Sequence, residues 1–282
     1  MPNRHQRRAQ NAGRRGTIRA ARLRCVACER VNQPMTGEHM FPLWLIDYCD
    51  VRRDGIAWAG QDSGANPRTA TVPLCEACNH RLGSELEDPV SRILPRLEAG
   101  HGITDREAEL LVRWLWKFEG LGVCYARLGL PGWRYSDRWT LIERILGDPP
   151  RQVRHLLTLA IGLTNQNDPE HEDWPMGLDH GASGLDGFFV SGVFRKTALM
   201  VTLSRFADMI PPWYGTYQLG SVTDPAVACF VPPVCFPFSA DAIGATKRVS
   251  LPLKKAHEDF ALEHQARRPV TGVRPQLIIP NR

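Results

Sequence analysis

The sequence predicts an α+β fold in which a small cysteine-rich unit is followed by helices and then by strands. Three observations indicate this. Short strand-like stretches stand beside two Cys-x-x-Cys pairs, at Cys25–Cys28 and Cys75–Cys78. Apolar residues then recur at helical spacing between residues 104 and 163, and runs of β-branched and aromatic residues typical of strands return from residue 188.

Length and composition allow one large domain or two small ones, because the chain has 282 residues, of which 43% are hydrophobic. The net charge of +5 is modest but unevenly spread. Residues 1–24 carry many arginines and no acidic residue, which is typical of a flexible arm that contacts phosphates. The arginines taken as nucleic-acid-binding candidates in this arm are Arg4, Arg7, Arg8, Arg14 and Arg15.

The basic arm is followed by no apolar segment, which argues against a secretory signal, and no apolar run predicts a membrane span. We therefore expect a cytoplasmic protein with no membrane contact. A mitochondrial presequence stays open if the source is eukaryotic. In a reducing compartment, Cys-x-x-Cys pairs indicate metal ligands rather than disulfides. The sequence leaves the oligomeric state undecided, with a homodimer as one alternative.

Residues 25–90 are predicted to form the cysteine-rich unit. A short strand reaches His39, a polar and Gly-rich insertion covers 49–68, and a second strand covers 69–74. This second strand should deliver the second cysteine pair to a helix that begins at about Asn79.

Residues 91–164 are predicted to be helical. A capping-box pattern at Thr104–Glu107 should start one helix, Ser136 should start a second, and a third should cover about 150–163. The apolar positions of the first helix are Leu110, Leu111, Trp114, Leu115 and Phe118. Two prolines are expected to break the chain before it into short pieces, namely Pro89 and Pro95.

Residues 165–187 are rich in Asn, Asp, Gly and Pro without a clear period, which predicts a linker or long loop. Residues 188–282 are predicted to form a small mixed β-rich region whose role the sequence does not indicate. Its expected elements are strands over 188–194, 198–203, 216–222 and 226–231, and a helix over about 253–266.

Two Cys-x-x-Cys turns supply the four soft ligands that zinc binds tetrahedrally. We therefore predict a structural zinc site made by Cys25, Cys28, Cys75 and Cys78. In a small unit with few large apolar residues, metal binding would contribute much of the folding free energy. The remaining cysteines are scattered, and Cys229 and Cys235 are expected to pack as small apolar residues.

A Glu38-His39 pair lies between the two cysteine pairs, and Asn79 directly follows the last cysteine. Phosphodiester hydrolysis needs a base that activates water and a divalent cation that stabilises charge. His39 can be the base, while Glu38 and Asn79 offer hard oxygen ligands. Neighbouring side chains on a strand point to opposite faces, so Glu38 and His39 can serve one phosphate only if the strand bends or ends there.

The order Cys-x-x-Cys, Glu-His-x-x-Pro and Cys-x-x-Cys-Asn resembles the HNH (His-Me finger, ββα-metal) endonuclease family, in its variant with four zinc cysteines. The resemblance covers about residues 25–90. It implies a zinc-stapled ββα-metal module that hydrolyses DNA phosphodiester bonds. It also implies that His39 is the general base and that Glu38 and Asn79 hold a catalytic Mg²⁺ or Mn²⁺.

The sequence departs from the family pattern at two positions. Glu38 stands where many members have Asp, and Ala70 stands where many carry an Asn that orients the base. Two alternatives for orienting His39 follow, a backbone carbonyl or a residue of the insertion such as Asn66.

Four further residues near Asn79 have open roles. Arg81 is expected to hold a phosphate, and His80 to lie on the surface or support the site. Glu85 and Glu87 either add a metal ligand or cap and solvate the helix, and we favour the second. The acidic stretch 170–173 is expected to be solvated charge.

A second hypothesis belongs to another class of protein. The unit could be a zinc-stabilised nucleic-acid-binding domain without catalysis, which the missing Asn at position 70 favours. RNA as the substrate also stays open.

Overall fold

The structure is a computed structural model that describes residues 24–51, 68–127, 139–148, 153–163, 176–180, 189–212, 214–220 and 242–267. Within these ranges the predicted α+β fold is present, with helices and two antiparallel sheets of two and five strands. Several predictions lie outside the described residues. They concern the arm up to residue 23, Asn66, the stretch 170–173, the strand over 226–231, Cys229 and Cys235.

The first sheet is a two-stranded antiparallel ladder made by β1 (Met35–His39) and β2 (Thr71–Cys75), so both predicted short strands are present, the second of them shifted by one or two residues. A short helix that was not predicted, α2 (Leu43–Tyr48), follows β1. Helix α3 (Glu76–Leu82) follows β2 without a loop. It begins three residues before the expected Asn79, so the fourth cysteine and Asn79 both lie within the helix.

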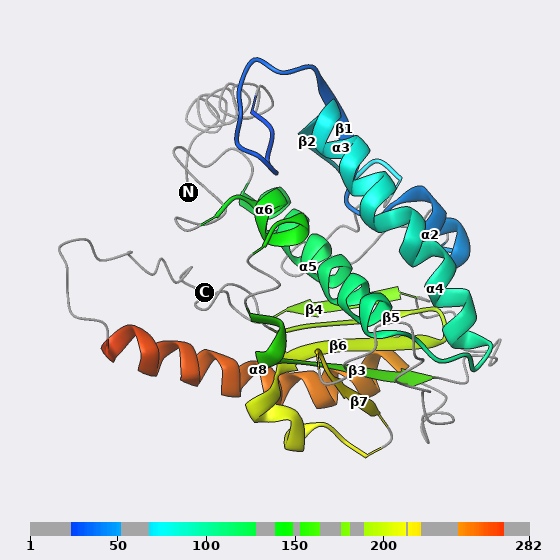
Figure 1. Cartoon of the computed structure of the whole chain (residues 1–282), viewed down its shortest axis with the longest axis vertical. Helices are drawn as coiled ribbons and strands as arrows, with labels where there is room; N and C mark the ends of the chain where they lie inside the picture. Colours follow the sequence, from blue (N-terminus) through cyan, green and yellow to red (C-terminus); the bar gives the residue numbers. More distant parts are fainter. Residues whose placement is uncertain are drawn as a thin grey trace, which may run out of the picture.

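Helix α3 continues through a π-helical turn, η1 (Gly83–Glu87), into α4 (Asp88–Glu98) (Figure 1). The predicted breaks at Pro89 and Pro95 are therefore wrong. Pro89 lies in the first turn of α4, and the π turn before it already interrupts the regular α-helical hydrogen bonds. Pro95 is inside the helix, and burial of one apolar face offsets its lost hydrogen bond. The buried residues of that face are Val90, Ile93, Leu94 and Leu97.

Helix α5 (Asp105–Arg127) is the longest of the described helices that precede the second sheet. The predicted capping box is confirmed, because the Thr104 N–H donates to the Glu107 carboxylate at 2.8 Å and the Glu107 N–H donates to Thr104 Oγ1 at 3.2 Å. The expected apolar face is also confirmed, since Trp114 and Phe118 lie in the core.

Helix α6 (Leu141–Leu146) packs beside α5 and begins later than the predicted Ser136. Thr140 has extended backbone and forms its own capping box with Glu143, which fixes the start of the helix at Leu141. Trp139, expected on the apolar face of this helix, precedes it.

The second sheet corrects two predictions. Residues 157–163 form a central strand, not the end of a helix, and the expected linker 165–187 contains another strand. The run Leu157–Leu163 is buried on both faces of the strand. Its large aliphatic residues alternate with Thr158, Ala160 and Gly162, which is the period of 2 that a strand has and a helix lacks. In sheet order the strands are β4 (Met176–His180), β5 (Val190–Phe194), β6 (Thr197–Leu203), β3 (Leu157–Leu163) and β7 (Gly215–Gln218).

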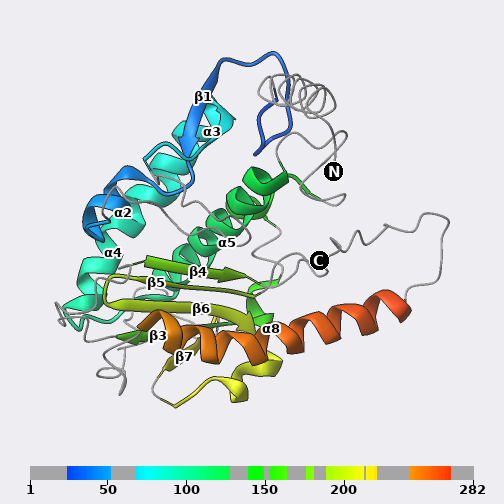
Figure 2. The same cartoon turned by 180° about the vertical axis from the view of Figure 1, so that it is seen from behind.

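Helices cover both faces of this antiparallel sheet (Figures 1 and 2). On β6, Leu199 belongs to the core that contains Trp114 of α5, whereas the adjacent Met200 belongs to a second core with Leu253 of α8 (Ala242–Arg267). Alternation along the strand thus sends one set of side chains to α5 and the other to α8. Helix α8 begins about three turns before the predicted position. Among the helices described, none combines the length and apolarity that a bilayer crossing requires.

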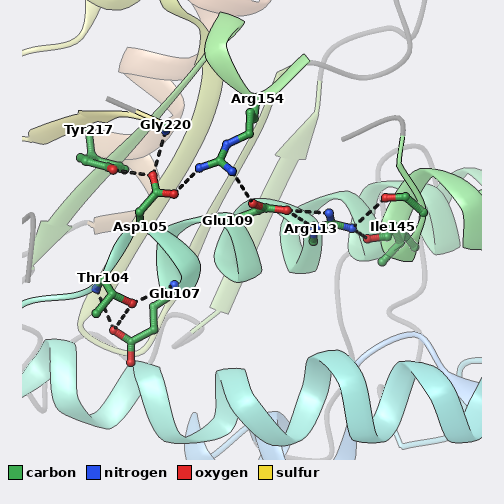
Figure 3. A network of polar contacts seen from close by, with 10 residues as sticks. Thr104, Asp105, Glu107, Glu109, Arg113, Ile145, Arg154, Tyr217 and Gly220 are labelled. Carbon is green, nitrogen blue, oxygen red and sulfur yellow. Dashed lines mark hydrogen bonds and ion pairs between the residues drawn. The ribbon is translucent and has the colours of Figure 1, made fainter. Parts of the chain in front are cut away.

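A polar network joins the start of α5 to the sheet edge (Figure 3). Asp105 accepts hydrogen bonds from the Tyr217 hydroxyl on β7 and from the Gly220 N–H, and it pairs with the Arg154 guanidinium. Burial alone would raise the pKa of Asp105, but these donors outweigh it and hold the pKa below its usual value.

The same network reaches α6. Arg154 also lies 3.5 Å from Glu109, which pairs with Arg113 one turn further along α5. Arg113 in turn donates to the backbone carbonyl of Ile145 at 2.6 Å (Figure 3). Charge-assisted hydrogen bonds therefore attach α5 both to the five-stranded sheet and to α6.

Candidate functional site

The four cysteines predicted to bind zinc come together. The Sγ atoms all lie within 4.8 Å of one another, and none of them forms a disulfide. The Sγ atoms of Cys28 and Cys75 are 3.8 Å apart. Four ligands placed tetrahedrally at about 2.3 Å from zinc are separated by about 3.8 Å, so this spacing fits the metal. The cluster, Cys25, Cys28, Cys75 and Cys78, could hold an ion such as zinc.

Backbone hydrogen bonds fix the turn that carries the first cysteine pair. The Val26 N–H donates to the Pro73 carbonyl of β2 at 3.0 Å. The Ile142 N–H of α6 donates to the Ala27 carbonyl at 2.9 Å. The cysteine cluster is thereby attached both to the two-stranded sheet and to the helical layer.

The pKa values of the thiols are shifted in different directions within the cluster. A hydrogen bond from the Cys78 thiol lowers the pKa of Cys25 to about 4, and holding that proton raises the pKa of Cys78. Burial instead raises the pKa of Cys49 to about 12. Burial also raises the pKa of Cys28. Because the thiolate is the form that binds metals, metal binding to the cluster must release the protons of Cys28 and Cys78.

His39 is the last residue of β1, and the chain bends directly after it. The condition under which Glu38 and His39 could serve one phosphate is therefore met. The His39 Nε2 atom lies 3.1 Å from the backbone carbonyl of Arg68. A carbonyl only accepts, so in the neutral imidazole Nε2 carries the hydrogen and Nδ1 has the lone pair.

The contact between His39 and the Arg68 carbonyl concerns the role of the base-orienting Asn, which this sequence lacks at position 70. Ala70 is buried and offers no side-chain partner, but the Arg68 carbonyl contacts the imidazole of His39. The Arg68 guanidinium pairs with Asp47 on α2, which helps to hold this carbonyl in place. A backbone carbonyl, one of the two alternatives drawn from the sequence, thus contacts His39; the other, Asn66, lies outside the described residues.

Glu38 has a partner that sequence reasoning missed. The Nζ atom of Lys117, on α5, lies 2.6 Å from Glu38 Oε1, and the Lys117 side chain is completely buried. The sequence does indicate that Lys117 has a buried partner, because Lys117 follows Trp114 by one turn on the apolar face of α5. A lysine at such a position needs a buried carboxylate.

Glu87 is the second partner of Lys117, at 2.6 Å from Nζ to Oε1. Its other oxygen accepts from the indole N–H groups of Trp44 at 2.8 Å and Trp114 at 3.2 Å. The favoured interpretation of Glu87 as a capping or solvated residue is therefore wrong, since the residue is buried. Burial alone would lower the pKa of Lys117, but Glu87 and Glu38 outweigh it and raise the pKa, so the ammonium stays charged.

Asn79 lies on the same side of β1 as Glu38. Its Nδ2 atom donates to Thr36 Oγ1 at 2.9 Å, which leaves the amide oxygen as a possible ligand. Thr36 and Glu38 are two residues apart on a strand and project from the same face. The two candidate metal ligands therefore flank one face of β1.

The remaining candidates lie on the exposed side of α3 and η1. Arg81 pairs with Glu85 one turn on, at 2.7 Å, and both side chains are about half exposed. This pairing uses part of the charge that was expected to contact phosphate. His80 is exposed, as expected for a surface residue.

No protein family, curated protein or solved structure matches this chain in comparisons of its sequence and fold.

Proposed function

We propose that this chain is an HNH-type endonuclease that hydrolyses DNA phosphodiester bonds with the help of a divalent cation. The observation that carries the proposal is the orientation of His39. The Arg68 carbonyl fixes its Nε2 as the protonated nitrogen, and this leaves Nδ1 as a base at the end of β1, beside Glu38. The position is consistent with the sequence resemblance.

In the proposed mechanism, His39 Nδ1 takes a proton from the water that attacks phosphorus. A bond forms between the water oxygen and phosphorus, the bond to the leaving sugar oxygen breaks, and that oxygen is protonated by solvent. A bound Mg²⁺ or Mn²⁺ supplies positive charge for the phosphate and the leaving oxygen. Glu38 and Asn79 would hold this cation through carboxylate and amide oxygens, which are the ligands that such ions prefer.

The other predicted parts have supporting roles in this proposal. A zinc ion on the four cysteines would hold the hairpin and α3 together, since the cluster joins the turn before β1 to the start of α3. The arginines of the arm and Arg81 would contact DNA phosphates without reading sequence.

The test is plasmid nicking by the purified protein with Mg²⁺ or Mn²⁺, compared with His39→Ala. Loss of a general base should reduce the rate by roughly 10²–10⁴-fold. His101→Ala is the matched control, because His101 is exposed and belongs to none of the proposed groups, and it should nick at the unchanged rate. Nicking that persists at the full rate in His39→Ala would overturn the proposal.

One observation favours the second candidate, a zinc-stabilised nucleic-acid-binding protein without catalysis. The Lys117 ammonium already occupies Oε1 of the proposed metal ligand Glu38. Under this alternative, the protein binds DNA or RNA with an affinity that falls steeply with salt. The nucleic acid stays uncleaved when Mn²⁺ is added, with the wild type and with His39→Ala alike.

A further inference from the structure

A buried group of three charges connects the proposed site to helix α5. Lys117 lies between Glu38 and Glu87, at 2.6 Å from an oxygen of each. We infer that Lys117 and Glu87 are positioning residues for Glu38, and that Glu87 supplies the charge that lets Glu38 bind a cation although it is paired with a lysine. This inference rests on the proposed function and deepens it.

The geometry assigns the two oxygens of Glu38 different roles. Lys117 holds Oε1, and within the described part of the chain Oε2 accepts no hydrogen bond. The Glu38 side chain is 13% exposed, whereas that of Lys117 is 0% exposed. The ammonium therefore cannot reach a substrate, but it can fix the carboxylate so that Oε2 is presented at the surface of the site.

The charges of the group explain how this carboxylate still attracts a cation. A lone Lys117–Glu38 pair would be neutral, and a divalent ion beside it would gain little. Glu87 adds a second negative charge, so the three side chains together carry a net charge of −1. Glu87 thus compensates for the positive charge with which Lys117 neutralises Glu38.

The group is also held rigidly. Glu87 is fixed by the indoles of Trp44 and Trp114, and Trp114 lies one turn before Lys117 on α5. The three residues come from β1, η1 and α5, and η1 and α5 also contact each other. The position of Glu38 therefore depends on a helix outside the predicted unit of residues 25–90. Buried charges of this kind are costly to leave unpaired, which favours one arrangement.

The experiment compares Mn²⁺ affinity, measured by isothermal titration calorimetry, with the nicking rate at saturating Mn²⁺. Three full-length variants are used: Glu87→Gln, the double variant Lys117→Met/Glu87→Gln, and Glu119→Gln as the control. Glu119 also belongs to α5 and forms a buried ion pair, with Arg144 at 2.7 Å, that is not part of the group. Melting temperatures are recorded for all of them.

Glu87→Gln makes the group neutral and should weaken Mn²⁺ binding about tenfold. The double variant returns the net charge to −1, so its Mn²⁺ affinity should recover to within about threefold of the wild type. Its nicking rate at saturating Mn²⁺ should nevertheless fall about 10–100-fold, because Oε1 is no longer held. Glu119→Gln should lower the melting temperature and change neither the Mn²⁺ affinity nor the rate.

Recovery of affinity by a second substitution is not expected from residues that only stabilise the fold. The inference is overturned if Glu87→Gln binds Mn²⁺ as the wild type does, or if the double variant nicks at the wild-type rate. If Glu87→Gln fails to fold, the double variant alone decides, since it replaces the pair by neutral side chains of similar size. If the wild type neither binds Mn²⁺ nor nicks DNA, the proposed function itself is wrong.

Discussion

Replacing Asp105 by Asn should destabilise the whole protein, because Asp105 joins the start of α5 to the five-stranded sheet. Asn keeps one oxygen, which can still accept from Tyr217 and Gly220, since both donate to Oδ1. The Oδ2 atom, which pairs with Arg154, becomes an amide that faces the guanidinium. The change therefore removes one ion pair and leaves the two neutral donors in place.

The size of the effect follows from the exposure of the partners. Hydrogen bonds to charged groups contribute about 1.5–3 kcal/mol each, and the lower half applies here because the Arg154 side chain is 31% exposed. A loss of about 2 kcal/mol corresponds to a melting temperature lower by roughly 4–8 °C for a protein of this size.

The effect should depend on pH in a defined direction. The pKa of Asp105 is lower in the folded protein than in the unfolded chain. Its ionised form therefore contributes stability fully above the unfolded pKa of about 3.9, and the contribution is lost as the pH falls through the folded pKa. The difference in melting temperature between the wild type and Asp105→Asn should be constant from about pH 5 to 7 and shrink below about pH 4.

Thermal unfolding followed by circular dichroism at pH 7 and pH 3 measures both quantities. Asp50→Asn is the control, because Asp50 is exposed and its positive φ of 52° suits Asn equally well. A melting temperature of Asp105→Asn within about 2 °C of the wild type at pH 7 would refute the reasoning, as would an equal difference at both pH values.

Two further predictions concern the metal cluster and the packing of α5. The purified protein should contain about one zinc per chain by mass spectrometry; Cys78→Ser should lose it, whereas Cys49→Ala should keep it. A Cβ atom at Gly120 would lie 2.2 Å from Cδ1 of the buried Leu141, so Gly120→Ala should lower the melting temperature by roughly 2–4 °C despite its better helix propensity. A Cβ atom at Gly83 meets nothing within 4 Å, and an equal loss in Gly83→Ala would contradict this explanation.

Local patterns in the sequence were sufficient wherever the interacting residues are close in the chain or share a strong chemical signal. The capping box at Thr104 links residues three apart, and its hydrogen bonds form as predicted. The four cysteines are distant in sequence, but few other arrangements satisfy two Cys-x-x-Cys turns, so their clustering could be predicted as well. The two strands that flank them were predicted from their β-branched residues and the turn residues around them.

Predictions failed where packing decides between local alternatives. The run of β3 was predicted to be the end of a helix although its large aliphatic residues alternate, and pairing with β6 and β7 shows that it is a strand. Pro95 disfavours a helix locally, but α4 continues through it because its apolar face is buried against the core. In α4 the burial of apolar surface outweighs the local preference.

The sequence by itself determined the cysteine cluster, the strand that carries Glu38 and His39, and the start of α5, since these depend on spacing and on side-chain chemistry. Only the tertiary structure decided what surrounds Glu38. Lys117 is 79 residues away from it, and Glu87 is 30 residues from Lys117. No local pattern encodes that contact, because a buried ammonium finds its carboxylates only when β1, η1 and α5 have packed together.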